Sequence, residues 1–336
     1  MHNRPMIDGI QILRGLAAFL VIIRHGTKEI NGFNFEVGQF GVDLFFVISG
    51  FVIYLTSRNI DWYVFAKKRV IRIVPLYWLM TTVTLLGAIL LNKESLSALF
   101  EHFVFSLFFI PHGDLFPTLY VGWTLNYEMW FYLIFGTLIY FRADLLKGSS
   151  ITILSAIFLG LILLSLSEWQ VSPLTVPLLP ITIEFLAGVW IAHFYLKGFS
   201  FNKVLCSAIL VAAVIVLAIM PTAGAYTPWR PLVWGGPAIL VVIGFLGFER
   251  HIDFNKFGFL MLFGNASYAT YLIHPLVIRF LMIAKDKFAL QEIDNHILLF
   301  LLIAGSITAG LIFHLTIEKL LVNVFTNKFL QKKVNS

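Results

Sequence analysis

The chain has 336 residues, of which 59% are hydrophobic and only 12% are charged. Its mean hydropathy is +0.88. Soluble domains are about 45–50% apolar and about 25% charged, so this composition excludes a water-soluble domain. It also excludes a disordered chain, which needs low hydrophobicity, and a disulfide scaffold, because Cys206 is the single cysteine. Long apolar runs, rather than alternating residues, exclude an outer-membrane barrel. We therefore expect an all-α polytopic membrane protein.

Ten apolar runs approach the roughly 20 residues that a helix needs to cross a bilayer. They cover residues 7–28, 38–57, 73–92, 119–141, 149–167, 174–196, 202–220, 231–248, 257–283 and 294–320. A shorter run over 96–110 carries Glu101 and His102, and we expect it to form an interfacial or re-entrant segment. The loops between the runs are short, which predicts one integral-membrane domain over residues 1–336.

The net charge of +6 follows from the orientation of the spans rather than from nucleic-acid binding, for which we expect no role. With ten spans and a cytoplasmic N-terminus, 17 of the 24 Lys and Arg residues lie on the inner side. An eleventh span would place the basic C-terminal tail outside. We therefore expect both termini to be cytoplasmic. The first span carries Arg14 and lacks a cleavage site after it, so we expect it to be retained rather than cleaved.

Arg14 and His25 lie within the first span, where ionisable residues are costly and therefore candidates for function. Eleven residues separate them, which is close to three helical turns, so they share one face about 16 Å apart. Arg14 is then near the cytoplasmic side and His25 near the outer end. The structural alternatives are an arginine that extends to the headgroups and a histidine at the interface.

Asp43 begins the second span at the same outer level as His25. A carboxylate there would orient the imidazole and raise its basicity, as in a catalytic dyad. We therefore expect Asp43 to pair with His25. The alternative is an acidic residue that only marks the water boundary.

Lys68, Arg69 and Arg72 begin the third span, just before Pro75. Arg69 and Arg72 are three residues apart and face the same way on a helix. Two guanidinium groups on one face suit the recognition of phosphate. The alternative is a set of cytoplasmic anchors that only fix the topology.

Glu128 lies near the middle of the span over 119–141, with Thr124 and Tyr132 at helical spacing. A buried glutamate needs partners, and a structural ion pair with Arg14 competes with a catalytic role. Glu184 is a second acidic residue within a span. Further along, Ser267, Tyr271 and His274 form one helical stripe. A kink at Pro275 with a core histidine is the structural alternative.

Five separated motifs resemble acyltransferase family 3, a group of bacterial membrane acyltransferases. They are LRGLAAFLVIIRH, GVDLFFVISGFVI, RVIRIVPLYW, WTLNYEMWFY and NASYATYLIHPLVI, and they occur in the order of that family. The opening IDGIQILRGLAA is similar to surface-polysaccharide acetyltransferases. The resemblance implies a ten-helix enzyme of the bacterial cytoplasmic membrane that acts in exopolysaccharide or surface-polysaccharide O-acetylation.

The resemblance also implies the substrates. The donor would be cytoplasmic acyl-CoA, most often acetyl-CoA, and the acceptor a hydroxyl on an extracytoplasmic glycan or glycolipid. No metal and no permanently bound cofactor are implied. Among the family's motif residues, Arg14 and His25 and the pair Arg69 and Arg72 are the ones associated with activity.

We accordingly expect two sets of residues and a third that is less settled. The catalytic set is His25, Asp43 and Glu128. The acyl-CoA set is Arg14, Lys68, Arg69 and Arg72, with the phosphates at the cytoplasmic face and the pantetheine arm threaded past Arg14. For the acceptor or the oxyanion, the candidates are Trp123, Ser267, Tyr271 and His274. His25 would act as general base or carry the acyl group.

A ten-helix transporter of a glycolipid or an anionic metabolite is the alternative from another class, because carriers also use intramembrane acids and histidines. The chain shows no inverted repeat and no matched pair of broken spans, which disfavours it. A non-catalytic sensor or scaffold would tolerate neutralisation of these polar residues. A covalent acylated product distinguishes the enzyme from both. Oligomeric state and the identity of the acceptor stay open.

Overall fold

The computed structural model describes residues 7–329, apart from 31, 33, 92–94, 114, 221, 250 and 291. Residues 1–6 and 330–336 of the predicted domain, and the last residue of the span expected over 73–92, therefore lie outside the described residues. The same holds for five basic residues used to orient the chain: Arg4, Lys93, Arg250, Lys332 and Lys333. Within the described part every regular element is a helix and no strand occurs.

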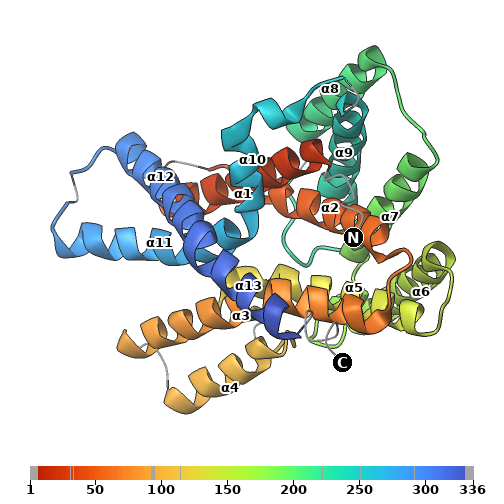
Figure 1. The fold of residues 1–336 in the computed structure, drawn as a ribbon. Coiled ribbons are helices and arrows are strands. Elements are labelled where there is room, and N and C mark those ends of the chain that lie inside the picture. Colours follow the sequence, from red (N-terminus) through yellow and green to blue (C-terminus); the bar gives the residue numbers. More distant parts are fainter. Residues whose placement is uncertain are drawn as a thin grey trace.

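The elements follow one another along the chain as helices joined by turns and longer loops (Figure 1). The first half contains α1 (Asp8–Lys28), η1 (Glu36–Gln39), α2 (Phe40–Ser57), α3 (Trp62–Leu90), α4 (Leu96–Leu107), η2 (Tyr120–Gly122), α5 (Trp123–Tyr140) and α6 (Leu145–Leu166). The second half contains η3 (Val176–Leu178), η4 (Pro180–Thr182), α7 (Ile183–Leu196), α8 (Lys203–Ile219), η5 (Pro231–Gly235), α9 (Gly236–Phe248), η6 (Phe254–Lys256), α10 (Gly258–Asn265), α11 (Ser267–Lys287), α12 (Asn295–Phe313), η7 (His314–Glu318) and α13 (Lys319–Phe329).

Seven of the described helical segments are long and apolar enough to cross a membrane. They are Asp8–Lys28, Glu36–Ser57, Trp62–Leu90, Leu145–Leu166, Pro231–Phe248, Ser267–Lys287 and Asn295–Phe329. They coincide with seven of the ten expected spans, which confirms an all-α polytopic membrane protein. The other three expected spans correspond to α5, which carries several polar residues, and to the shorter helices α7 and α8. Ten crossings and two cytoplasmic termini stay predictions.

Two of the expected boundaries differ from the structure. Helix α3 begins at Trp62, eleven residues before the expected start, because Asp61 caps it by accepting a hydrogen bond from the Tyr63 backbone at 2.9 Å. The basic cluster therefore lies inside a helix. The span expected over 257–283 is broken between α10 and α11. Gly264 precedes the break, and a Cβ on it would lie 2.0 Å from the Gln11 carbonyl oxygen of α1.

The run over 96–110 forms the 12-residue helix α4, which packs against α3. Near its end, Trp78 of α3 donates to the Leu107 carbonyl at 2.9 Å, and Tyr77 donates to the Ser106 carbonyl at 3.2 Å. Twelve residues rise only about 18 Å, which is short of a full crossing. An interfacial or re-entrant position stays the prediction for this helix.

Helix α2 lies at the centre of the packed core, against α1, α5, α7 and α9. Glycines allow the closest of these contacts. A Cβ on Gly50 would lie 1.9 Å from the Phe185 carbonyl oxygen, and one on Gly188 would lie 2.0 Å from that of Val47. Small residues let membrane helices approach in this way. In Figure 1 the α3–α4 and α11–α12 pairs project to the same side of this core.

Candidate active site

His25 and His274 come from different helices and contact each other directly. His25 lies in the last turn of α1 and His274 in α11, and the Nδ1 atom of His25 is 2.6 Å from the Nε2 atom of His274. Their rings are nearly parallel, and the Tyr120 ring meets the edge of His25. His274 is fully buried. The partner of His25 is therefore a second histidine, and the expected pairing with Asp43 is wrong.

The hydrogen bonds of this pair fix where the protons lie. The Nδ1 atom of His274 is 3.3 Å from the Thr270 carbonyl oxygen, which can only accept a proton. His274 Nδ1 therefore carries a hydrogen, and its Nε2 is left to accept one from His25 Nδ1. It follows that Nε2 of His25 holds a lone pair when the ring is neutral. No described residue bonds to that atom, so it is available to a substrate.

A cavity of about 810 Å³, its opening included, lies between α1, α2, α3, α5 and α11. Seven of the residues singled out in the sequence line it: Arg14, Arg69, Arg72, Thr124, Glu128, Tyr132 and Tyr271. On α2 the lining runs from Val42 to Val52, which is about 15 Å along the helix axis. The cavity is therefore elongated.

The three arginines of the cavity have few partners. Arg69 donates to Thr56 at 2.5 Å and stacks on the Tyr132 ring, but its buried Nε has no hydrogen-bond partner among the described residues. Among the described residues, Arg14 donates a hydrogen bond only to Gln11, at 3.3 Å. Arg72 forms no hydrogen bond or ion pair with any described residue. Unpaired guanidinium groups at a cavity wall provide donors and charge for an anionic ligand.

Glu128 lines the same cavity, where its carboxylate accepts a short hydrogen bond from Tyr132. No described nitrogen of Arg14 lies within ion-pair distance of Glu128, so the alternative of a direct pair with Arg14 is not observed. The structure places Glu128 among the cavity arginines and away from His25.

The remaining expected residues divide between the cavity and its surroundings. Tyr271 lines the cavity at the end nearest His274. Ser267 is fully buried and Trp123 nearly so, and neither lines the cavity. Lys68 is exposed on α3, one turn before Arg72, and also lies outside the cavity.

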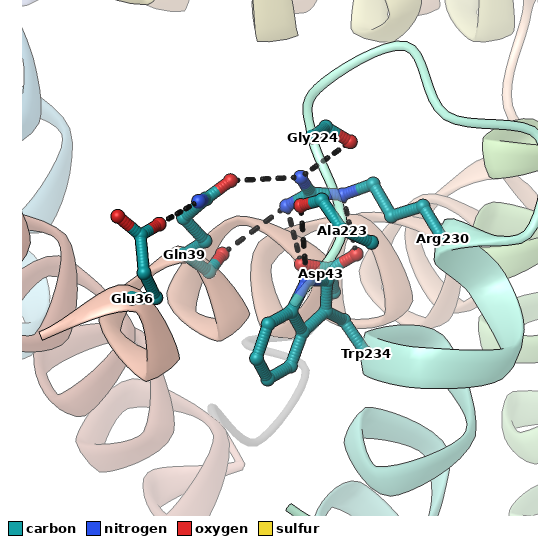
Figure 2. A network of polar contacts seen from close by, with 7 residues as sticks. All are labelled: Glu36, Gln39, Asp43, Ala223, Gly224, Arg230 and Trp234. Carbon is teal, nitrogen blue, oxygen red and sulfur yellow. Dashed lines mark hydrogen bonds and ion pairs between the residues drawn. The ribbon is translucent and has the colours of Figure 1, made fainter. Parts of the chain in front are cut away.

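Asp43 forms a buried ion pair with Arg230 (Figure 2). The Nε atom of Arg230 donates to Oδ1 at 2.9 Å, and Nη2 donates to Oδ2 at 2.6 Å. The other donors of Arg230 reach the side chain and carbonyl of Gln39 and the carbonyl of Gly224, at 3.2–3.3 Å. Both charged side chains are essentially inaccessible. A planar, permanently charged guanidinium binds both carboxylate oxygens, and no hydrogen bond joins Asp43 to His25.

Arg230 was missed as a site residue in the sequence, although a signal for it existed. It is one of seven basic residues that the ten-span topology places on the outer side, against the usual charge bias. Arg24 is another, and it pairs with Glu36 at 2.5 Å. Gln39 donates to Glu36 at 2.5 Å and so connects the two pairs. A cation on the disfavoured side of a membrane protein points to an unseen acidic partner.

A second histidine–carboxylate pair was also missed. His314 and Glu318 lie on the π-helical segment η7, with Nδ1 and Oε2 2.6 Å apart, and both are buried. The four-residue spacing of the two residues was the available signal.

Comparison with known proteins agrees with the motifs. The profile of the acyltransferase domain family Acyl_transf_3 matches residues 7–315. The exopolysaccharide production protein ExoZ of Rhizobium meliloti (strain 1021) is 33% identical over 272 residues, which are 79% of this chain and 83% of that protein.

Two O-acetyltransferases match smaller parts. OatA of Staphylococcus aureus (strain NCTC 8325 / PS 47) is 27% identical over 48% of this chain and 30% of its own length. The putative peptidoglycan O-acetyltransferase YrhL of Bacillus subtilis (strain 168) is 34% identical over 33% of this chain and 18% of its own length. No solved structure matches. With a family match over most of its length, the chain belongs to acyltransferase family 3 and is a membrane O-acyltransferase.

Proposed function

We propose that the enzyme transfers an acetyl group from cytoplasmic acetyl-CoA to a hydroxyl of an extracytoplasmic glycan or glycolipid, within the cytoplasmic membrane of a bacterium. The observation that carries this is the cavity. It extends from three arginines with few partners to Tyr271, which lies one helical turn before His274 on α11. The names of the relatives, an exopolysaccharide production protein and two O-acetyltransferases, support a surface glycan as acceptor.

The donor would bind as a transient substrate, with no resident cofactor. Its phosphates would meet Arg69 and Arg72 at the end of the cavity formed by Val52 and Tyr132. The pantetheine arm is long and nearly uncharged, and it would lie along Phe45 and Phe46 toward Tyr271 and Thr124. Arg14, between these ends, has donors for the amide and hydroxyl oxygens of the arm. Lys68 would contribute at most from outside the cavity.

His25 would be the general base. Its Nε2 lone pair takes the proton of the acceptor hydroxyl, and the acceptor oxygen attacks the thioester carbonyl carbon. His274 acts through His25, because it holds Nδ1 and keeps the lone pair on Nε2. A positioned histidine typically contributes about 10²–10⁴ in rate. An acyl intermediate on the same nitrogen would instead give ping-pong kinetics.

The test uses inside-out membrane vesicles from cells that make the acceptor, supplied with acetyl-CoA labelled in the acetyl group. We expect covalent label in the glycan or glycolipid fraction with the wild type. We expect a loss of about 10²–10⁴-fold with His25→Ala, with binding of acetyl-CoA retained. His251→Ala, an exposed histidine in the turn after α9, is the matched control and should transfer at the wild-type rate.

Two outcomes would count against the proposal. If His25→Ala transferred acetyl groups at the wild-type rate, His25 would not be the general base. Label that accumulates in the vesicle lumen as a free small molecule, with no covalent product, would favour the transporter alternative.

A further inference from the structure

Thr124 and Tyr271 line the cavity at the end nearest His274, and both are buried, as is the neighbouring Val121. The Tyr271 hydroxyl donates to the Val121 carbonyl at 2.9 Å, and the Thr124 hydroxyl donates to the same carbonyl at 3.1 Å. The two hydroxyl oxygens are 3.0 Å apart. One carbonyl thus has two donors, although one would satisfy it.

Tyr271 separates the cavity from the histidine pair. It lines the cavity, and its ring centre is 5.8 Å from that of His274, which lies three residues later on α11. His274 in turn holds His25. Neither histidine is among the residues that line the cavity. A thioester that advances along the cavity therefore meets Tyr271 before it meets His25.

Three polar side chains were candidates for stabilising the oxyanion, and the structure distinguishes them. Ser267 and Trp123 do not line the cavity, whereas Tyr271 both lines it and carries a hydroxyl at its outer end. We propose that the Tyr271 hydroxyl is the oxyanion donor, and that it leaves the Val121 carbonyl for the thioester oxygen when the donor is bound. This assignment rests on the proposed acyl transfer.

The exchange leaves no buried carbonyl unpaired, because Thr124 continues to donate to Val121 when Tyr271 turns away. In the reaction, the acceptor oxygen bonds to the carbonyl carbon and its proton passes to Nε2 of His25. The negative charge on the carbonyl oxygen receives the hydrogen bond from Tyr271. The carbon–sulfur bond then breaks, and His25 returns the proton to the thiolate of CoA. Atoms and charge balance without another reactant.

The decisive variant is Tyr271→Phe, which keeps the ring and removes the hydroxyl. We expect the transfer rate at saturating acetyl-CoA to fall about 10²–10³-fold, the usual loss for one oxyanion donor. The dissociation constant of acetyl-CoA, measured on the purified protein, should not change. Tyr226→Phe is the matched control, because Tyr226 also donates to a backbone carbonyl, that of Leu115 at 2.9 Å, outside the cavity. It should transfer at the wild-type rate.

A second measurement keeps the proposal testable if the Tyr271→Phe variant does not fold. Replacement of Tyr271 by 3-fluorotyrosine keeps the shape and strengthens the hydroxyl as a donor, so the transfer rate should change while acetyl-CoA binding does not. A wild-type transfer rate in Tyr271→Phe would overturn the assignment of Tyr271 as oxyanion donor. If His25→Ala lost transfer in the same assay, the proposed acyl transfer would still hold. Absence of transfer in the wild type would overturn both.

Discussion

Two clusters of arginines in this molecule differ in how completely their charges are paired. Arg230, which immediately precedes the π-helical segment η5, is inaccessible and directs hydrogen bonds to Asp43, Gln39 and Gly224. In the cavity, Arg14 and Arg69 each donate one hydrogen bond, and Arg72 donates none to any described residue. All three nitrogens of the Arg230 guanidinium therefore have protein partners, whereas those of the cavity arginines do not.

The difference indicates which cluster is scaffold and which is a binding site. Arg72 is exposed and Arg14 and Arg69 are partly exposed, so their guanidinium groups can be reached by an anionic ligand that supplies the missing partner. The Asp43–Arg230 pair instead ties the segment around Gly224 to the start of α2. A charged residue within a span is therefore a site candidate only after its partners have been counted.

The largest effect is expected from Arg230→Ala, which leaves Asp43 buried and unpaired. Such a change typically costs about 3–5 kcal/mol of stability, and we expect the unfolding temperature in detergent to fall sharply. The double variant Arg230→Met with Asp43→Leu should recover much of the loss, since both charges of the ion pair are then removed together. If the double variant were as unstable as Arg230→Ala, shape rather than charge would explain the effect.

Removal of the cavity arginines should weaken binding and leave stability nearly unchanged. Each of Arg69→Ala and Arg72→Ala removes charge-assisted hydrogen bonds to the donor, worth about 1.5–3 kcal/mol, so the dissociation constant of CoA should rise about 10–100-fold. Titration calorimetry on the purified protein measures this. Lys68→Ala is the matched control on the same helix and should change affinity little. An unchanged affinity in both arginine variants would make them topology anchors.

Sequence spacing predicted those parts of the site that one helix determines. Glu128, Thr124 and Tyr132 fall on one face because they are four residues apart, and Arg69 and Arg72 because they are three apart. All five line the cavity. The family resemblance supplied the expectation that Arg14 and the Arg69–Arg72 pair serve one donor, and the structure places them together.

Pairings between helices were not predictable in the same way. Asp43 and His25 were expected at one level in the membrane, but the Asp43 carboxylate on α2 pairs with Arg230 instead. Arg230 lies 187 residues away from it in the sequence. His274 was already a candidate residue because its motif was recognised. Its pairing with His25 could not be predicted, because no spacing rule connects α1 with α11. The sequence predicts where residues lie along and around one helix. Which side chain of another helix they contact depends on how the two helices are rotated relative to each other.

Glu128→Gln is expected to have a smaller effect, in the opposite direction from the arginine variants. Neutralising the carboxylate raises the positive charge of the cavity, and a unit charge a few ångströms away contributes roughly 1 kcal/mol at high dielectric. We therefore expect acetyl-CoA to bind about fivefold more tightly, as measured by titration calorimetry. If Glu128 were instead the catalytic acid or base, the transfer rate would fall and the affinity would stay the same.

The smallest effect is expected from Glu36→Gln, at the water-facing end of the paired cluster. Glu36 and Arg24 are partly exposed, with side-chain accessibilities of 27% and 15%, and such pairs contribute less than about 1 kcal/mol. Glutamine also keeps an oxygen that accepts from Arg24. The unfolding temperature should therefore change by no more than a few degrees, and transfer not at all.

The same substitution made in the Arg230→Ala background decides how far the paired cluster extends. Gln39 contacts both Glu36 and Arg230, so a continuous network would make the two losses non-additive. We expect additive losses, because the buried pair with Asp43 satisfies Arg230 before Gln39 contributes through longer bonds of 3.2–3.3 Å. Strong coupling would mean that the outer surface next to His25 and the buried pair respond as one unit. Arg24, which neighbours His25 in the sequence, would then transmit changes in that unit to the base.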